Sequence, residues 1–303
     1  MPDPSALNGF ISYTSSLMHH IDTKPSYVNC YVLRGGLGNQ LFILSAAIVS
    51  SIQNQLPIQI KLMVENRLPF NTDRKLEILS LFKENEIEFC EYNKFTALKE
   101  LASWRLNDHP ESYFDDAFSN KGGIQKGYFQ DTRIVELAWN ELQQRFLKTE
   151  DFSSLLNLNT FDRIAIHFRS GDIRSNIRSR FHHGSTNLKY YLDAAKLLHS
   201  ASNIERVLLI SEAFTPEIDQ LNVLLVSNGF EVDFSVSQDS FTDLRLLAQS
   251  KYVVCSNSSY SWWGAWLSKC NGGVRSVMPI PWLARHSAYD SNLPIITSTH
   301  IAR

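Results

Sequence analysis

The residues best suited to chemistry lie at the end of an apolar run, Arg163-Ile-Ala-Ile-His-Phe-Arg-Ser-Gly-Asp172. Its isoleucines are β-branched, which predicts a strand buried on both faces, as in a parallel α/β sheet. His167, Arg169 and Asp172 follow at the carboxyl end, where ligands bind in open α/β sheets. Five arginines and a single acid lie between residues 163 and 180, and a guanidinium matches the oxygens of a phosphate. The stretch predicts a phosphate clamp, with a local Arg169–Asp172 salt bridge as the alternative.

A second stretch, Ser256-Asn-Ser-Ser-Tyr-Ser-Trp-Trp-Gly-Ala-Trp266, lies between a predicted strand and a predicted helix. Small hydroxyl and backbone N–H groups at such a junction bind phosphate. The candidate ligands are Asn257, Ser258, Ser259 and Ser261. Helix capping is the alternative, although three serines exceed what one cap needs. At least two of the three tryptophans are expected in the core.

A third candidate is the glycine turn Arg34-Gly-Gly-Leu-Gly-Asn-Gln40, between a predicted strand at 27–33 and a predicted helix at 41–53. Such a turn presents backbone N–H groups to an anion through Gly36, Gly38, Asn39 and Gln40. The alternative is simple helix entry with Asn39 as the cap. The dinucleotide pattern fails because Leu41 occupies the third glycine position, which disfavours a Rossmann oxidoreductase.

The elements that must position these residues alternate between strand and helix across residues 163–280, which predicts a doubly wound parallel sheet. We expect two domains, residues 1–155 and 156–303, with a second strand at 57–62 and Ser211 and Glu212 ending a strand that begins at 206. Further helices are predicted within 1–26 and near 76–83, 96–104 and 133–148. A capping box of Ser240 with Asp243 is an option for the helix at 240–249.

Composition narrows the class of partner. The net charge of −2 argues against general affinity for nucleic acid or a membrane surface. The four cysteines have no zinc-ligand spacing and suit a reducing cytosol. No apolar run approaches the roughly 18 residues of a membrane span, and no signal peptide is visible. We therefore expect a cytoplasmic enzyme.

Several of these motifs resemble those of one enzyme family. His167-Phe-Arg-Ser-Gly-Asp172 resembles the His-x-Arg-Arg-Gly-Asp motif of the bacterial α-1,2-fucosyltransferases, with Ser170 in place of the usual second arginine. The departure leaves the role of that arginine open, including acceptor choice. The other matching segments span about residues 30–280 in the family's order: Gly35–Phe42, Gly127–Gln130, His183-Gly184, Tyr190-Tyr191, Asp243–Ser250 and Ser256–Leu267.

The resemblance implies an α/β, GT-B-like fold of two Rossmann-like domains with the donor cleft between them. It also implies transfer of L-fucose from GDP-fucose to the 2-hydroxyl of a terminal β-galactoside, with inversion. By similarity, Gly38 and Asn39 face the donor from the first domain, while most of the donor site lies in residues 156–303. The sequence holds no Asp-x-Asp pair, so we expect no metal and no cofactor.

The residue patterns and the resemblance together indicate a role for each candidate residue. His167, Arg169, Asp172 and Asn39 are the candidates for catalysis. Glu212 or Asp243 could accept hydrogen bonds from guanine beside Ser211, although capping is nearly as good an account of Asp243. Asp131, Asp172 and His183 are candidates for the base that takes the acceptor proton, and Asp131, His183 and Trp262 for acceptor binding. A strongly oxocarbenium-like transition state would need no strong base.

Two competing functions remain open from the sequence. One is a glycosyltransferase of similar build with another nucleotide sugar or acceptor. The other is a non-enzymatic sugar- or nucleotide-binding protein that uses the tryptophans as a stacking platform. The arginine clamp, the hydroxyl-rich turn and the glycine turn occur together, which disfavours the binding protein.

Overall fold

The computed structural model describes residues 29–33, 35–55, 59–63, 77–82, 86–90, 114, 123–125, 127–169, 186–237, 239–282, 288–295 and 298–302. The first part of the chain forms a four-stranded parallel sheet in the order β3-β2-β1-β4. Its strands are β1 (Asn29–Leu33), β2 (Gln59–Met63), β3 (Ile87–Cys90) and β4 (Gly123–Gln125). Helices α2 (Leu37–Asn54) and α5 (Thr132–Phe146) pack on each other beside it.

The second part forms a six-stranded parallel sheet in the order β10-β9-β8-β5-β6-β7. Its strands are β5 (Phe161–His167), β6 (Arg206–Ser211), β7 (Glu231–Val236), β8 (Ser250–Val254), β9 (Arg275–Ile280) and β10 (Ser298–Ala302). From β5 the sheet continues through β6 to β7 on one side and through β8 and β9 to β10 on the other. The strand order therefore reverses between β5 and β8, which is the topological switch point where ligands bind in such sheets.

Helices cover both faces of this second sheet. The helices α9 (Leu188–Ser202) and α10 (Pro216–Val226) pack together on one face, and α11 (Ser240–Ala248) and α12 (Ser259–Cys270) on the other. Strand β5 is buried on both sides, because Ile164 and Ile166 pack in the cluster with α9 and Ala165 in the cluster with α12. The expected buried parallel strand and the doubly wound α/β architecture are confirmed.

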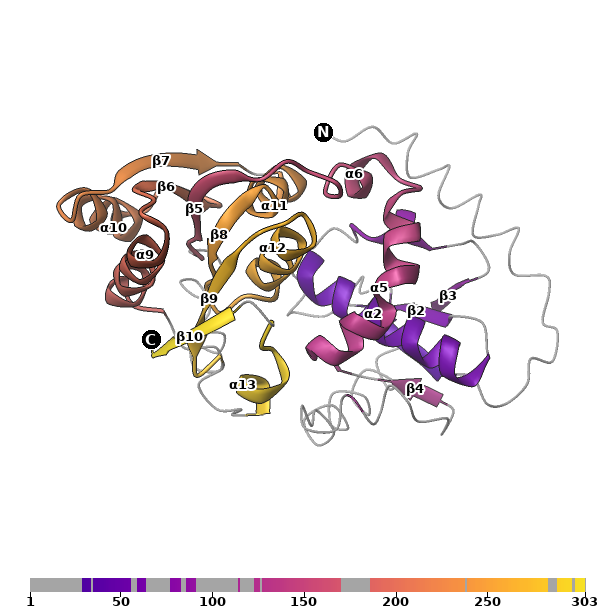
Figure 1. Cartoon of the computed structure of the whole chain (residues 1–303). Helices are drawn as coiled ribbons and strands as arrows, with labels where there is room; N and C mark the ends of the chain where they lie inside the picture. The colour runs from indigo at the N-terminus through magenta and orange to yellow at the C-terminus, as the bar shows by residue number, and fades with distance from the viewer. Residues whose placement is uncertain are drawn as a thin grey trace, which may run out of the picture.

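Aromatic side chains join the two parts of the molecule, and Figure 1 shows α12 and α2 side by side between the sheets. The ring of Phe42 on α2 lies 4.7 Å from Trp262 and 5.4 Å from Trp263 on α12, measured between centroids. Trp139 on α5 meets Trp266 edge-on at 5.6 Å. All three tryptophans of α12 are buried, so the core-packing alternative is confirmed for each.

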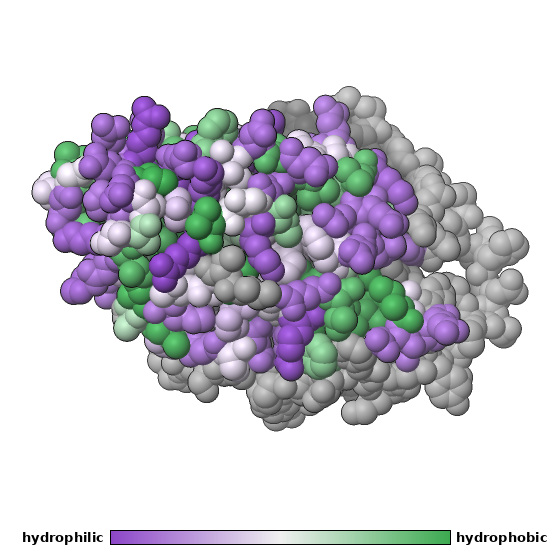
Figure 2. All heavy atoms as spheres, in the orientation of Figure 1, coloured by the Kyte–Doolittle hydropathy of each residue, from purple (hydrophilic) through white to green (hydrophobic). Residues whose placement is uncertain are grey.

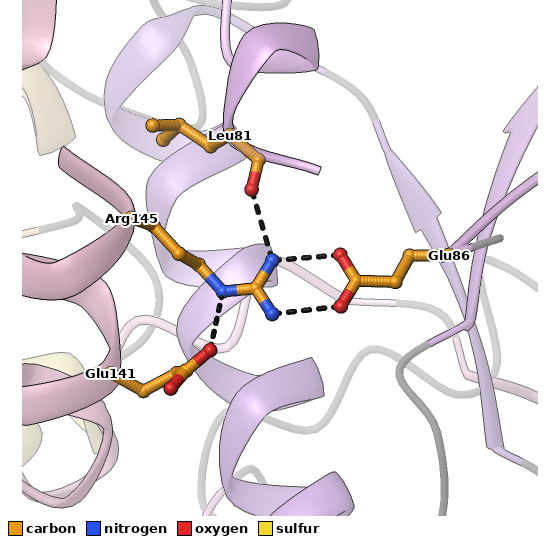
Figure 3. A network of polar contacts seen from close by, with 4 residues as sticks. All are labelled: Leu81, Glu86, Glu141 and Arg145. Carbon is orange, nitrogen blue, oxygen red and sulfur yellow. Dashed lines mark hydrogen bonds and ion pairs between the residues drawn. The ribbon is translucent and has the colours of Figure 1, made fainter. Parts of the chain in front are cut away.

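A buried ion pair fixes the edge of the first sheet to α5 (Figure 3). The Arg145 guanidinium donates to both carboxylate oxygens of Glu86, at 2.7 and 2.8 Å, and also to Glu141 and to the Leu81 carbonyl. Burial lowers the pKa of Arg145, but the two carboxylates outweigh that effect and leave the pKa above its usual value. The pair therefore stays charged and holds residues 81–86 against the helix.

Several predicted elements need correction. The helix expected near 76–83 is only the short 3-10 turn η2 (Leu79–Leu81) within described residues 77–82. Strand β10 was not predicted. Asp239, not Ser240, caps α11, because its carboxylate accepts from the N–H groups of Phe241 and Thr242. The helices expected within 1–26 and at 96–104 lie outside the described residues.

The connection between the sheets contains α6 (Glu150–Ser153), and the domain division that we place after residue 155 lies in this connection and stays a prediction. On the face drawn in Figure 2, hydrophilic residues alternate with small apolar patches. No helix in the described part of the chain has the length and apolar character to cross a membrane.

Candidate functional site

The candidate site lies at the switch point, where the carboxyl ends of β5 and β8 are neighbours. His167 ends β5, and Ser256 follows β8. The His167 Nδ1 and Ser256 Oγ atoms are 2.9 Å apart, and Arg169 Nη1 donates to the Asn257 carbonyl at 3.1 Å. The two polar stretches singled out from the sequence therefore meet across the sheet.

His167 is almost fully buried and uncharged at neutral pH. Burial lowers its pKa to about 3, and the nearby positive charge of Arg169 adds to the effect. Its ring lies over Tyr260, with centroids 5.2 Å apart. A neutral imidazole has one N–H donor and one acceptor nitrogen, so His167 can hydrogen-bond a ligand without adding charge.

Two helix N-termini meet beside these residues. Gly36 is the N-cap of α2, and Ser258 is the N-cap of α12. A Cβ atom on Gly38 would lie 2.5 Å from the Ser259 carbonyl carbon and the Tyr260 nitrogen, so the two backbones are in direct contact. The N-terminus of a helix carries partial positive charge and N–H groups without partners inside the helix. Two such ends beside Arg169 favour a negatively charged group.

The geometry of α2 corrects the predicted glycine turn. The helix begins at Leu37, four residues earlier than expected, and its cap is Gly36 rather than Asn39. Asn39 therefore lies in the first turn of the helix, where its side-chain oxygen accepts from Gln130 Nε2 at 2.7 Å. Gln40 is fully buried and binds the Gly35 carbonyl and the Glu77 N–H. Gln40 thus holds the turn in shape from within the first part of the chain.

Two of the three candidate serines in the hydroxyl-rich turn bond its backbone, and the third is partly exposed. Ser258 caps α12 by accepting from the Tyr260 N–H at 3.3 Å. Ser261 is buried and donates to the carbonyls of Ser256 and Ser258 at 3.0 and 2.9 Å. Ser259 is half-buried, and its hydroxyl has no protein partner among the described residues. Ser259 is therefore the serine best placed to bind a ligand.

Acidic side chains follow β6 and lie on α11. Asp243 is nearly buried and accepts a hydrogen bond from Ser235 on β7 at 3.3 Å. Burial is the main reason that the pKa of Asp243 rises to about 7, and the charges of Asp239 and Glu212 raise it further. Glu212 is exposed, whereas Ser211 is buried and donates to the Ala213 carbonyl at 3.1 Å. Asp243 is not a helix cap, so the capping interpretation is wrong for it.

Two of the candidates for acceptor binding are buried and already bonded within the protein. Asp131 is fully buried, caps α5 and forms an ion pair with Arg133, so its carboxylate is already engaged. Trp262 is also fully buried and donates to the Leu293 carbonyl at 2.8 Å. Neither side chain has surface for an acceptor in this structure. Asp172 and His183 lie outside the described residues.

Three residues that sequence reasoning did not select connect the site. Ser256 holds His167. The Tyr260 hydroxyl donates to the Ser240 carbonyl at 2.5 Å, and the Ser240 hydroxyl donates to Glu77. The last contact joins the two parts of the chain. Ser256 and Tyr260 stand inside the quoted motif and could have been found, whereas Glu77 has no local signal because its partner is 163 positions away.

Within the described ranges, His, Cys, Asp and Glu side chains form no group of three or more that could hold a metal ion. The groups gathered at the site are the neutral His167 imidazole, the Arg169 guanidinium and the two helix ends, with acidic groups on the side toward β6 and α11.

The chain is similar in sequence to two glycosyltransferases. No family model matches the chain. The chain is 26% identical to an alpha-1,2-colitosyltransferase of Escherichia coli over 274 residues, which cover 84% of this chain and 91% of the relative. It is 25% identical to the O-antigen biosynthesis glycosyltransferase WbnK of Escherichia coli over 295 residues, 83% of this chain and 94% of the relative.

Solved structures show a distant likeness. POFUT1 in complex with GDP has a TM-score of 0.43 and 11% identity, over 85% of this chain and 99% of that chain. The E. coli heptosyltransferase WaaC with ADP has a TM-score of 0.43 and 14% identity, over 90% and 92%. The fucosyltransferase NodZ from Bradyrhizobium has a TM-score of 0.42 and 11% identity, over 80% and 94%. The two sequence relatives agree with the motifs, and the chain is accordingly a glycosyltransferase.

Proposed function

We propose that this glycosyltransferase moves L-fucose from GDP-fucose to the 2-hydroxyl of a terminal β-galactoside, with inversion and without a metal or other cofactor. The observation that carries the proposal is the convergence of the α2 and α12 N-termini beside Arg169 at the switch point of the second sheet. This arrangement gathers positive potential and N–H donors where a nucleotide sugar would place its diphosphate.

The chemistry requires stabilisation of a leaving group. The acceptor oxygen attacks the anomeric carbon from the face opposite the nucleotide, the bond from that carbon to the phosphate oxygen breaks, and its electrons stay on GDP. Negative charge therefore grows on the β-phosphate, and fixed donors aimed at it lower the barrier. Arg169, the N–H groups of the two helix ends and the Ser259 hydroxyl supply such donors.

Other residues take supporting roles in the proposal. His167 is neutral, so it contributes a hydrogen bond to the donor and does not repel the Arg169 guanidinium. Asn39, fixed by Gln130, faces the donor from the first part of the chain. Asp243 accepts from the N–H groups on the guanine edge, with Glu212 close enough to influence its charge. Ser211 and Asn257 shape the ends of β6 and β8 around the nucleotide.

The proton of the acceptor hydroxyl needs a destination. Because the Asp131 carboxylate is engaged by Arg133 and the α5 backbone, the proposal places this role on Asp172 or His183. If the transition state is strongly oxocarbenium-like, the departing phosphate can take the proton and no strong base is required. Replacing each of the two residues by alanine distinguishes the cases, since only a true base would show a lost limb in the pH profile of kcat.

A second candidate donor is a GDP-linked colitose. It is favoured by the name of one relative, an alpha-1,2-colitosyltransferase aligned over most of both chains. Colitose is fucose without its 3-hydroxyl, so one site could hold either sugar. A site that hydrogen-bonds the 3-hydroxyl would strongly prefer fucose, because its polar groups would be left unpaired by colitose. The proposed location is the cytoplasm, with peripheral association with glycan-assembly machinery.

The experiment compares GDP-fucose and GDP-colitose under identical conditions with lactose as acceptor, reading kcat/KM for each and the product linkage by NMR. The proposal expects an α-1,2-linked product with retained activity in EDTA. A product linked elsewhere on galactose, or transfer restored only by Mn²⁺ after chelation, would refute the corresponding part.

A further inference from the structure

The imidazole of His167 stands at one end of a chain of buried hydroxyl groups, and this chain fixes which ring nitrogen carries the proton. We propose that His167 is protonated on Nδ1, so that Nε2 is a bare acceptor that takes a hydrogen bond from a hydroxyl group of the nucleotide sugar and cannot bond its phosphates. The position of the proton follows from contacts within the protein, and the choice of ligand group rests on the proposed function.

The chain runs from the imidazole through two serine hydroxyls to the backbone. His167 Nδ1 lies 2.9 Å from Ser256 Oγ, and Ser256 Oγ lies 3.3 Å from Ser261 Oγ. The Ser261 hydroxyl in turn lies 2.9 Å from the Ser258 carbonyl oxygen and 3.0 Å from the Ser256 carbonyl oxygen. Both serine side chains are fully buried, so neither hydroxyl can exchange one of these partners for bulk water.

The direction of each hydrogen bond follows from the number of protons. A hydroxyl has one proton to donate, whereas a carbonyl oxygen can only accept. The Ser261 proton must point at one of its two carbonyl neighbours, because a bare hydroxyl oxygen at these distances would be repelled by both. Ser261 Oγ is then left as an acceptor for the Ser256 proton. With that proton directed at Ser261, only a proton on Nδ1 can join His167 to Ser256.

The other tautomer of His167 makes one hydrogen bond fewer. With the proton on Nε2, Ser256 would have to donate to Nδ1, and the Ser256 and Ser261 oxygens would face each other at 3.3 Å with no proton between them. The Nδ1–H tautomer gives three hydrogen bonds in series, each of which polarises the next. Burial lowers the pKa of His167 to about 3, so the ring carries a single proton and Nε2 keeps its lone pair.

The bare Nε2 atom selects the kind of ligand group that it can bind. It has no hydrogen-bond partner among the described residues, and it is turned away from Ser256 because Nδ1 faces that residue. The diphosphate oxygens of a nucleotide sugar only accept hydrogen bonds, so they cannot pair with a bare nitrogen. Hydroxyl groups of the sugar or the ribose can donate to it. Arg169, two residues further along the chain, has the opposite preference, because a guanidinium carries only donors.

The position of the proton is tested by a long-range proton–nitrogen NMR correlation on protein with ¹⁵N-labelled histidine, in which the His167 signal is identified by its loss in His167→Asn. We expect Nδ1–H in the wild type. In Ser261→Ala the majority should change to Nε2–H, because Ser256 then has no acceptor but Nδ1 among the described residues. Ser268→Ala is the matched control: Ser268 is a buried serine of the same helix, and it donates to the Ser250 carbonyl at 2.6 Å. It should leave the His167 signal unchanged. A wild-type ring protonated on Nε2, or a ring that is unaffected in Ser261→Ala, would overturn the inference.

The ligand group is tested with His167→Asn, whose amide can still donate to Ser256 but has no acceptor at the place of Nε2. Calorimetric titrations compare this variant with the wild type for GDP-fucose, GDP and 2′,3′-dideoxy-GDP. The affinity for GDP-fucose should fall by roughly fivefold to tenfold, as expected for one hydrogen bond. A loss confined to GDP-fucose places the hydroxyl on the transferred sugar, and a loss shared by GDP but not by dideoxy-GDP places it on the ribose. Equal losses for all three ligands, or no loss for GDP-fucose, would overturn the inference.

The two measurements also separate this inference from the proposed function. If the wild-type protein binds neither GDP nor GDP-fucose, the proposed function fails, and the NMR spectrum still decides which nitrogen carries the proton. If the wild-type protein binds both ligands while His167 is protonated on Nε2, only this inference fails.

Discussion

The chemistry depends first on how one charge, that of Arg169, is placed. Its side chain donates to the Asn257 carbonyl, next to the N-cap of α12. A guanidinium fixed in this way loses little freedom when a phosphate arrives, and its contact strengthens as charge grows on the leaving group.

Arg169→Ala should therefore lower kcat as well as raise KM, with a loss in rate of about 10²–10³. Lys at 169 keeps the charge but loses the paired donors, so it should rescue only part of the rate. Steady-state kinetics and thermal unfolding on the same preparations check both points. If Arg169 only pairs with Asp172, the two variants Arg169→Ala and Asp172→Asn would melt earlier, while the former would keep near wild-type turnover.

The carboxyl group of Asp243 predicts a dependence on pH. Its pKa of about 7 exceeds the ordinary value of 3.8, chiefly because of burial. If the ionised form accepts from guanine, GDP affinity should fall by up to about tenfold per pH unit as the pH drops below 7. Stability should change in the opposite sense. The folded state holds a proton that the unfolded state has lost between pH 3.8 and 7, so stability falls as pH rises through that window.

Asp243→Asn tests both halves of that argument. The variant should lose the pH dependence of GDP binding and should melt later than the wild type at pH 8, where the native carboxylate is ionised in a poor environment. A wild-type GDP affinity that is flat between pH 6 and 8 would remove Asp243 from the base-binding role. Glu212→Gln is a useful comparison, because Glu212 is exposed and contributes to the pKa of Asp243 only through its charge.

At the scale of elements, the contact of α2 with α12 decides whether the two helix ends can act together. Gly38→Ala would place a methyl group 2.5 Å from backbone atoms of Ser259 and Tyr260, which cannot move away as a side chain can. The helices must separate, at a cost of about 1–3 kcal/mol in unfolding free energy. We expect lower stability together with a loss of GDP affinity, measured by urea unfolding and calorimetry.

A matched glycine helps to interpret that result. Gly264→Ala, in the middle of α12, would place a methyl group 2.5 Å from Cδ1 and 2.7 Å from Cβ of Leu247 on α11, and not against the partner helix α2. It should lower stability with less effect on GDP affinity. Equal loss of affinity in Gly38→Ala and Gly264→Ala at equal loss of stability would mean that general packing, and not the meeting of two helix ends, controls binding.

The buried ion pair of Arg145 with Glu86 is an element-level feature outside the site. Removing one partner leaves a buried charge, so Glu86→Gln should lower the unfolding free energy by about 3 kcal/mol. The double variant Glu86→Leu/Arg145→Met carries no buried charge and should be less destabilised. Urea unfolding of the three proteins checks this, and GDP affinity should stay unchanged in all of them. A Glu86→Gln protein as stable as wild type would contradict the role assigned to the pair.

Local sequence signals predicted most of the regular elements but not their contacts. β5, α5, α9 and the alternation that follows were all visible in apolar periodicity. The start of α2 was placed too late because Gly36 and Gly38 look like a turn, whereas Gly38 is needed for close approach to α12, more than 200 positions away. The capping box of Ser240 with Asp243 was one option for α11, but the cap is Asp239, one residue earlier and of an equally suitable type. The correct cap could therefore have been found from the local sequence.

At the scale of the molecule, the two sheets form one body through a shared aromatic core of α2, α5 and α12. The sequence identified the tryptophans but could not say which helices they join, because aromatic rings pack without a pairing code. The packing of the two parts of the chain against each other also brings Glu77 to Ser240, and this contact completes the site. The candidate phosphate ligands could be named from motifs, whereas Glu77 has no local signal and is recognised only through its contact with Ser240.

The central claim is that the chain transfers a fucose-like sugar from a GDP donor, and a donor panel tests it most directly. The 303-residue protein is incubated with lactose and one donor at a time, GDP-fucose, GDP-colitose, GDP-mannose or UDP-galactose, each with and without EDTA, and products are read by mass spectrometry. We expect a product from GDP-fucose, GDP-colitose or both, undiminished by EDTA, and none from UDP-galactose. Transfer from the UDP donor alone would refute the proposed function.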